Sequence, residues 1–580
     1  MIKYIVVMLF IFSVYFYTAG KNLNSDGDSI EMITAAYCNG TPHSPGYPLF
    51  IRLANLFIKL FGGLDFTVAQ RVYLLNNVIS IITLALVGLI INNVIRKLNT
   101  KYAYQKSIAI ILSVLYIAFS RTYWQESITA EVYQIHLFIN VIILYMLLVE
   151  KPVFTGLNFA VILGIFCGLG LANHISIIFF FPVIFFVLLI KAKWKKIIIF
   201  FTIMLITASV FYGDMMTRAK KNPDINLGQP DNFERLCDVV LMKQYGEVMN
   251  SGLYTAAKIE FLKKNFFSNE FDLIFFLISI VGFCFFAVWD KKNFYVLTAF
   301  SGLYFISVFL FYRQLTYKVV YDTIYVFFLP IYIGISIFFG YGLCVVFILL
   351  NKIKIYRVVC VMLIFVVILL ISANFVNNFN NNNNRQIKIY EILISDIIDE
   401  LNFNSPIEKK ILLTEVDDLI YLGWYYQVVE KKFNDVLFVH PELLKTEWYR
   451  KKNGLNYKNI SEFLNDKADN LFFIINDNPE IRKLKTECIG LTFKYSLNKG
   501  IVSLQDYRIA DNLKEYKKID RNSIKNILSH YSSAYVCKGI FAAKNKKFKI
   551  SEDFFIKSLL CDESNIDATS NLLILQQNKK

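Results

Sequence analysis

The hydrophobic residues of this chain are gathered into long blocks in its first two thirds, with short polar gaps between them. Many blocks approach the roughly 20 residues that a helix needs to cross about 30 Å of hydrocarbon. Eleven blocks are present, near residues 2–20, 74–95, 107–119, 134–149, 156–173, 175–190, 197–213, 271–289, 293–312, 323–350 and 355–375. One such run is compatible with a buried core helix, but eleven in succession predict an all-α membrane domain with about 11 transmembrane helices over residues 1–375.

Two features of these blocks leave alternatives open. The blocks at 107–119 and 134–149 are short, so one of them could be a re-entrant or buried helix. The first block ends in Thr18-Ala19-Gly20, which is compatible with a cleaved signal peptide. Its apolar stretch is long for a signal peptide, so we favour an uncleaved first helix.

Composition and charge support this interpretation and orient the chain. Hydrophobic residues make up 56% of the 580 residues and charged residues 18%, against roughly 45–50% and 25% in soluble proteins. With a cytoplasmic N-terminus, the inner gaps carry most of the basic residues of the short gaps, as the positive-inside rule requires. These are Arg96, Lys97, Lys101, Lys106, Lys151, Lys191, Lys193, Lys195, Lys196, Lys291, Lys292, Lys352, Lys354 and Arg357. The net charge of +16 therefore reflects topology, and no nucleic-acid partner is expected.

Three regions are predicted to lie outside the membrane: residues 21–73, residues 214–270 and the tail. The tail begins with a polar, Asn-rich linker over 376–390. Short apolar runs of strand length alternate with helical patterns over 391–524 and predict an extracytoplasmic α/β domain. Residues 525–580 resemble one tetratricopeptide-like helical pair, although a generic helical hairpin fits nearly as well. One repeat cannot bury its own apolar face, so it must dock on a neighbour or partner.

The cysteines and glycines exclude several other classes. The nine cysteines show no metal-ligand spacing, and no phosphate-binding glycine loop occurs, so ATP-driven transport has no support. Five cysteines lie in external regions, where a disulfide can form, but their spacing does not select a pair.

The first outer region carries the candidate chemistry. Asp26, Asp28 and Glu31 fall within six residues, just past the first block, and a helix is predicted to begin near Ser29. Asp28 and Glu31, three residues apart, would then share a helix face. The acids could simply cap an interfacial helix, or they could act as a general base with a partner that orients it or holds a metal. A rigid turn follows at His43-Ser-Pro-Gly-Tyr-Pro48.

Several motifs then recur in the order of a known family. They are Asp28-Ser-Ile-Glu31, His43-Ser-Pro-Gly-Tyr-Pro-Leu49, Arg71-Val-Tyr-Leu-Leu75, Trp124-Gln-Glu-Ser-Ile-Thr-Ala-Glu-Val-Tyr133 and Gly168-Leu-Gly-Leu-Ala-Asn-His174. Over residues 21–450 the chain resembles the protein O-mannosyltransferase-like membrane family of the glycosyltransferase C superfamily, which includes a transferase for plexin-type receptors. Ile30, Ser44 and Tyr73 depart from the family pattern, in which glycine, proline and asparagine occupy these positions.

The resemblance implies a glycosyltransferase C-like fold and transfer of a sugar, mannose in this family, from a polyprenyl-phosphate carrier. Asp28 is expected to be the catalytic base with Glu31 beside it, and a single displacement would invert the anomeric centre. Residues expected to bind substrate are His43, Tyr47, Arg71, Glu131, Tyr133, His174 and Arg313. Besides the donor lipid and the bilayer, the expected partner is a protein or glycan acceptor. No cofactor is assigned; a divalent metal is compatible with the acids.

Each assignment has a plainer alternative. Glu131 could solvate a short outer loop, His174 could be an internally satisfied histidine, and Arg313 could anchor the membrane interface beside tyrosines. Within enzymes, the acceptor could be a lipid or surface glycan instead of a protein. A transporter or a receptor is the alternative of another class, but a transporter predicts internal repeats and charges at mid-membrane depth, which are not seen. The Asn, Lys and Ile usage indicates a low-GC bacterium, hence a multi-pass inner-membrane protein with an extracytoplasmic tail.

Overall fold

The computed structural model places most of the chain and divides it into two compact units. It describes residues 2–24, 27–100, 102–149, 156–191, 194–243, 270–311, 325–352, 354–405, 409–457, 460–466, 471–474, 486–495, 501–519 and 521–578. Unit 1 comprises Met1–Gly20, Thr41–Lys221 and Leu227–Arg385. Unit 2 comprises Lys21–Gly40, Asn222–Asn226 and Gln386–Lys580. Predicted site residue Arg313 lies outside the described residues.

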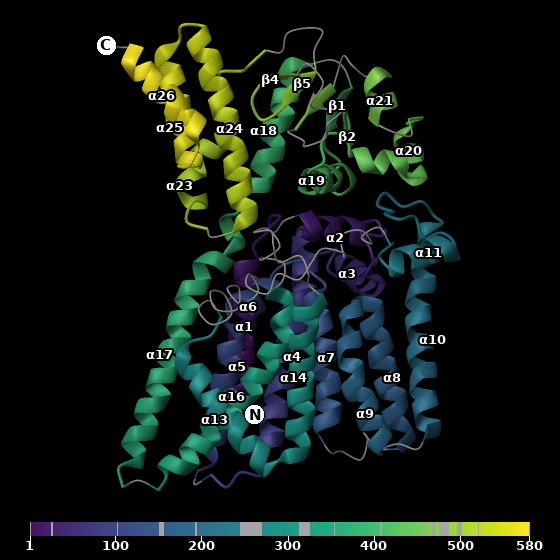
Figure 1. The fold of residues 1–580 in the computed structure, drawn as a ribbon, viewed down its shortest axis with the longest axis vertical. Helices are drawn as coiled ribbons and strands as arrows, with labels where there is room; N and C mark the ends of the chain where they lie inside the picture. The colour runs from purple at the N-terminus through teal and green to yellow at the C-terminus, as the bar shows by residue number, and fades with distance from the viewer. Residues whose placement is uncertain are drawn as a thin grey trace. The chain divides into compact units, whose positions relative to one another are not determined.

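Unit 1 is a helical bundle, drawn in purple to green in Figure 1. Its helices are α1 (Ile2–Ala19), α3 (Pro48–Leu60), α4 (Val68–Ile95), α5 (Ala103–Ala118), α6 (Arg121–Ser127), α7 (Tyr133–Leu148), α8 (Gly156–Asn173), η2 (Ile175–Phe180), α9 (Phe181–Lys191), α10 (Trp194–Ala219), α11 (Phe233–Val240), α13 (Leu273–Trp289), α14 (Lys291–Phe311), η6 (Tyr325–Phe328), α16 (Leu329–Leu350) and α17 (Tyr356–Asn382). Each of the eleven predicted apolar blocks coincides with helix.

Burial separates the central helices of the bundle from the peripheral ones. The apolar span that includes α16 is 72% buried, whereas the spans at α10 and α17 are each 17% buried. Apolar side chains therefore cover the outside of α10 and α17, as a hydrocarbon environment requires. The chain is a multi-pass membrane protein.

The exact count of 11 transmembrane spans is not confirmed. Among the described residues, five helices are long and apolar enough to cross a membrane: α1, α4, α10, the helix at Val326–Leu350 and the helix at Tyr356–Asn404. The pair α5 and α6, bent by 72°, can be counted as a sixth. Four further apolar helices are shorter, because breaks such as the one before η2 interrupt the blocks.

Two glycines allow one helix pair in unit 1, α8 and α10, to approach closely. A Cβ added at Gly164 would lie 2.7 Å from the Phe200 carbonyl oxygen, and one at Gly168 would lie 2.6 Å from the Met204 carbonyl oxygen. These glycines, four residues apart on α8, therefore let the α10 backbone approach, as small residues do between membrane helices. Figure 1 shows the two helices side by side.

The predicted outer region 21–73 is largely helical. Residues Gly27–Tyr37 form α2, two residues earlier than the predicted start, and Pro48–Leu60 form α3, which the sequence analysis did not predict. The Asn-rich run assigned to a polar linker continues α17 as helix to Asn382.

Unit 2 combines a mixed sheet with helices. The sheet has the order β2-β1-β3-β5-β4, in which β1 is parallel to β2 and β3, and β5 is antiparallel to β3 and β4. The strands are β1 (Lys410–Leu413), β2 (Val436–Val439), β3 (Leu471–Phe473), β4 (Thr486–Cys488) and β5 (Phe493–Tyr495). The helices are α2, α18 (Ile389–Asn404), α19 (Asp417–Val428), α20 (Glu447–Asn453), α21 (Ile460–Asp466), α23 (Leu513–Tyr516), α24 (Asn522–Lys544), α25 (Phe548–Cys561) and α26 (Ile566–Asn578).

Strands β1, β2 and β3 lie at short apolar runs of the predicted α/β domain over 391–524. A disulfide joins Cys488 of β4 to Cys537 of α24.

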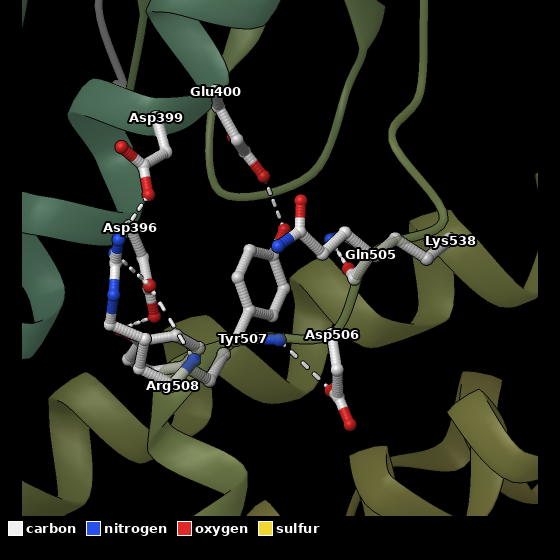
Figure 2. Close-up of polar contacts among 9 residues, drawn as sticks. Asp396, Asp399, Glu400, Gln505, Asp506, Tyr507, Arg508 and Lys538 are labelled. Atoms are coloured by element: carbon white, nitrogen blue, oxygen red, sulfur yellow. Dashed lines mark hydrogen bonds and ion pairs between the residues drawn. The ribbon is translucent and has the colours of Figure 1, made fainter.

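A buried polar network ties α18 to the turn before β5 and to α24 (Figure 2). The Glu400 carboxylate accepts hydrogen bonds from the backbone N–H groups of Leu491, at 3.0 Å, and Thr492, at 3.1 Å, and from the Tyr507 hydroxyl. Burial raises the pKa of Glu400 to about 7, although these donors favour the carboxylate. Lys538 of α24 lies over the Tyr507 ring, 3.6 Å from its centroid, and donates to the Gln505 carbonyl oxygen at 2.6 Å.

We predict that Glu400→Ala loosens the turn at Leu491 and Thr492, because two buried N–H groups lose their acceptor. An unsatisfied buried donor costs about 1–3 kcal/mol, so their amide hydrogens should exchange roughly tenfold faster or more. Hydrogen–deuterium exchange of the full chain in detergent measures this. Glu515→Ala, at an exposed position of unit 2, is the control, and equal exchange in the two variants would contradict the prediction.

Candidate active site

The two predicted catalytic acids lie on α2 of unit 2. Asp28 is in the first turn and is exposed, where its charge interacts favourably with the helix dipole. Glu31, one turn later, is only 1% exposed. The two acids therefore keep the predicted three-residue spacing but differ in solvent access. Within unit 2, α2 packs against α19.

The turn at His43 is held against α10 in unit 1. Gly46 has φ of +85°, and a Cβ at this position would lie 2.5 Å from the Met215 sulfur. Only glycine combines that backbone conformation with so close an approach. Tyr47 then caps α3 in the left-handed conformation, with Pro48 at the first helical position. The hydroxyl of Tyr47 lies 3.3 Å from Nε2 of His43.

Predicted site residues far apart in the sequence meet at His174. The Tyr47 ring stacks on the His174 ring with centroids 6.0 Å apart and an angle of 16°. Tyr133 lies 5.7 Å from the same ring. Burial, with a smaller contribution from His43, lowers the pKa of His174 to about 4. Unit 1 thus brings together His43, Tyr47, Tyr133 and His174, and His174 is neutral at physiological pH.

Asparagine side chains fix the segment that carries Glu131 between α6 and α7. Asn76 of α4 donates to the carbonyl oxygens of Thr129, at 2.7 Å, and Glu131, at 2.8 Å. Asn77 donates to the Ser127 carbonyl oxygen at 2.6 Å, and Asn173 to that of Val132 at 3.0 Å. This segment leaves Glu131 and Tyr133 half-buried.

Two residues of the motif over Trp124–Tyr133 have structural contacts. Trp124 is fully buried, and its indole N–H donates to the Thr18 hydroxyl of α1 at 3.0 Å. The Ser127 hydroxyl donates to the Tyr123 carbonyl oxygen at 2.6 Å. These contacts hold α6 in place, while Glu131 and Tyr133 of the same motif are half-buried.

Arg71 makes its hydrogen bonds at the end of α3. Its guanidinium donates to the carbonyl oxygens of Ile58, at 3.3 Å, and Gly62, at 3.4 Å. These are orphan acceptors at a helix C-terminus, where a cation is favourable. These contacts connect Arg71 to the end of α3.

Two acid clusters of unit 1 were not predicted from the sequence, a buried one at Glu270 and a half-buried one at Asp214. Glu270, next to the apolar block of α13, accepts from the Thr122 N–H at 3.2 Å and from the Thr122 hydroxyl. Burial raises its pKa to about 7, against the effect of these donors. Asp214 of α10 accepts from Arg52, at 2.6 Å, and Arg218, at 3.0 Å, which links α10 to α3. The only sequence signal is an acid at the end of an apolar block.

Comparison with known proteins supports the resemblance. Residues 28–198 match the family model described as the N-terminal domain of protein O-mannosyl-transferase TMEM260. The mouse protein O-mannosyl-transferase TMEM260 is 35% identical over 158 residues, which cover 27% of this chain and 21% of that protein. The Dictyostelium discoideum relative of the same name is 23% identical over 493 residues, which cover 77% of this chain and 58% of that protein. The chain thus spans about a fifth and about three fifths of these two relatives.

The fold is similar to that of a solved membrane protein. ArnT from Cupriavidus metallidurans, in a crystal structure bound to undecaprenyl phosphate, superposes with a TM-score of 0.52 at 10% identity, over 84% of this chain and 96% of that chain. At this identity the likeness concerns the fold alone. Together, these matches confirm the resemblance to the O-mannosyltransferase-like family and the glycosyltransferase C-like fold.

We predict that Asn76→Ala loosens the segment that carries Glu131, because two buried carbonyl oxygens lose their donor at about 1–3 kcal/mol each. Amide exchange over residues 127–133 should rise at least tenfold. The matched control is Asn92→Ala, which removes an exposed side chain from the same helix. Protection unchanged by Asn76→Ala would show that the asparagine does not hold this segment.

Proposed function

We propose that this chain is a membrane glycosyltransferase that transfers mannose from a polyprenyl-phosphate carrier to Ser or Thr hydroxyls of proteins on the extracytoplasmic side. One observation carries the proposal. The family match begins at Asp28 and contains every predicted site residue except Arg313. Since the chain spans only part of its curated relatives, their activity, sugar and acceptor enter here as proposals.

In the proposed reaction, the acceptor oxygen attacks C1 of the sugar while Asp28 removes its proton. The bond between C1 and the phosphate oxygen breaks, and its electron pair leaves with the polyprenyl phosphate. Asp28 suits the role of base because it is exposed, and the nearby Glu31 orients it. General-base catalysis typically contributes 10²–10⁴-fold. A single displacement inverts the anomeric centre.

Groups of unit 1 would stabilise the charges that develop on the donor. The Tyr47 hydroxyl and a ring N–H of His174 can donate to the departing phosphate. The carboxylate of Glu131 would favour an oxocarbenium-like sugar, as carboxylates do in glycoside hydrolysis. The proposal requires these groups to act with the acids of α2. Only residues 38–42 separate the end of α2 from His43, so the chain keeps the two within about 20 Å of each other.

Two observations support an external site. The basic residues of the short gaps place the end of α1 outside. Unit 2, which contains α2, has the disulfide between Cys488 and Cys537, and disulfides persist in oxidising compartments. The two relatives described above come from mouse and Dictyostelium discoideum, so the bacterial inner membrane is proposed from composition alone.

We predict that Asp28→Asn lowers transfer at least 100-fold, because an amide cannot take the acceptor proton. The measurement uses purified protein, mannose on a polyprenyl-phosphate carrier and a Ser/Thr-rich peptide. Asp65→Asn, an exposed acid of the same outer region, should retain full activity. Normal transfer by Asp28→Asn would remove Asp28 as the base. Activity with a lipid or glycan acceptor alone would favour the alternative acceptor class.

The same assay tests a divalent cation. Asp28 and Glu31 of α2 offer carboxylate oxygens that could hold a metal ion, and oxygen ligands suit Mg²⁺ or Mn²⁺. When bound, such an ion would neutralise charge on the phosphate. We predict that a chelator lowers transfer at least tenfold and that Mn²⁺ or Mg²⁺ restores it. Full activity in the chelator would contradict the cation and leave the acids as base and partner.

A further inference from the structure

His174 is tethered through one of its two ring nitrogens. It lies at the break between α8 and η2, where the backbone N–H of Ser176 donates to its Nδ1 at 3.2 Å. A backbone N–H can only donate, so Nδ1 must present a lone pair. A neutral imidazole carries one ring proton, which therefore resides on Nε2. The Ser176 hydroxyl lies 2.8 Å from the same Nδ1 and reinforces this arrangement.

A second histidine extends the tether into the bundle. Nε2 of His136, on α7, lies 3.0 Å from the Ser176 hydroxyl, so the serine bridges the two imidazoles. Asn140 contacts the same nitrogen at 3.0 Å, and Tyr304 of α14 lies 3.4 Å from it while donating to Asn140 at 2.7 Å. His136 is 5% exposed. Helices α7 and α14 therefore fix the His136 ring, which the Ser176 hydroxyl contacts.

A histidine at position 136 has an energetic cost that packing alone does not explain. Nδ1 of His136 is buried and makes no hydrogen bond to any described residue. A buried polar atom without a partner is unfavourable, and an apolar side chain at this position would avoid it. The imidazole at 136 therefore has a role beyond filling space, and its contact with Ser176 provides one.

The His174 ring also contacts two of the predicted site residues. Its ring stacks on Tyr47, whose hydroxyl approaches His43, and lies beside Tyr133. Because Nδ1 is occupied by Ser176, the nitrogen that remains for a ligand is Nε2, which points away from the tether. It presents a proton and no lone pair, so it can donate to a phosphate oxygen but cannot act as a base.

We infer that Ser176 and His136 are positioning residues that hold His174 as the Nε2–H tautomer, so that it offers an uncharged hydrogen-bond donor to the phosphate of the lipid-linked sugar. The assignment of the phosphate as the ligand rests on the proposed function, whereas the assignment of the tautomer does not. A neutral donor can orient the phosphate and stabilise its developing charge without binding the released polyprenyl phosphate as tightly as a cation would.

The tautomer is tested by nitrogen NMR on the full chain in detergent. The chain has only five histidines, so ¹⁵N-histidine labelling gives few signals, and His174→Gln identifies those of His174. At pH 7 we expect an unprotonated Nδ1 and a protonated Nε2. Ser176→Ala removes the hydroxyl but keeps the backbone N–H, so the Nε2–H tautomer should persist, whereas Ser176→Pro, which removes that N–H, should shift the signals toward a mixture of tautomers. A protonated Nδ1 in the native chain would overturn the inference, whether or not the chain transfers sugar.

The positioning role is tested by transfer kinetics. Loss of the hydrogen-bond partner that orients a metal-bound histidine typically costs about 10–100-fold, and we expect an effect of the same order here, so Ser176→Ala should lower kcat at least tenfold. Its matched control is Ser279→Ala, which removes another buried hydroxyl, one bonded within its own helix. Equal kcat in the two variants would overturn the role of Ser176. If the native chain shows the expected tautomer but transfers no sugar from any donor, the result would contradict the proposed function and not the tautomer.

Discussion

The segment between α6 and α7 is not part of either helix, and the arrangement of unit 1 depends on how its carbonyl groups are satisfied. Asn76 and Asn77 of α4 and Asn173 of α8 supply the missing donors. Most of these carbonyl groups belong to buried residues, where water does not replace a lost donor, so these contacts fix α4, α6, α7 and α8 relative to one another. Glu131, Tyr133 and His174 are positioned as a consequence, because each is adjacent in sequence to a carbonyl or amide in this set.

The same constraint accounts for the polar groups deeper in unit 1 and for the network of unit 2. Ser176 satisfies His174 and contacts His136, while Glu400 satisfies the N–H groups of a turn. In both places a buried polar group is surrounded by partners from separate elements, so each network specifies one arrangement of its helices. Nδ1 of His136 is one of several buried polar atoms of unit 1 without a hydrogen-bond partner among the described residues, and it lies beside the proposed site, where unsatisfied groups are expected to carry function.

Much of the architecture could be predicted because membrane helices and strands leave periodic signals. All eleven apolar blocks are helical, and β1, β2 and β3 lie at apolar runs of strand length. The number of spans could not be predicted, because a kink such as that between α5 and α6 depends on packing and not on composition. Helix α3 was missed because the turn residues that precede it dominate the local pattern. Glu270 was missed because a single acid beside an apolar block is an ordinary sequence feature.

By itself, the sequence determined that this is a membrane protein, and it identified most of the residues around the candidate site. The spacing of Asp28 and Glu31 and the rigidity of the His43 turn are local properties. They depend on residues adjacent in sequence and not on how the chain packs. Tertiary structure alone decided that Tyr47 stacks on His174, that Arg71 bonds to the end of α3 and that Ser176 sets the tautomer of His174. Those outcomes depend on contacts between residues that are distant along the chain or on the geometry of a helix break, and no local pattern encodes them.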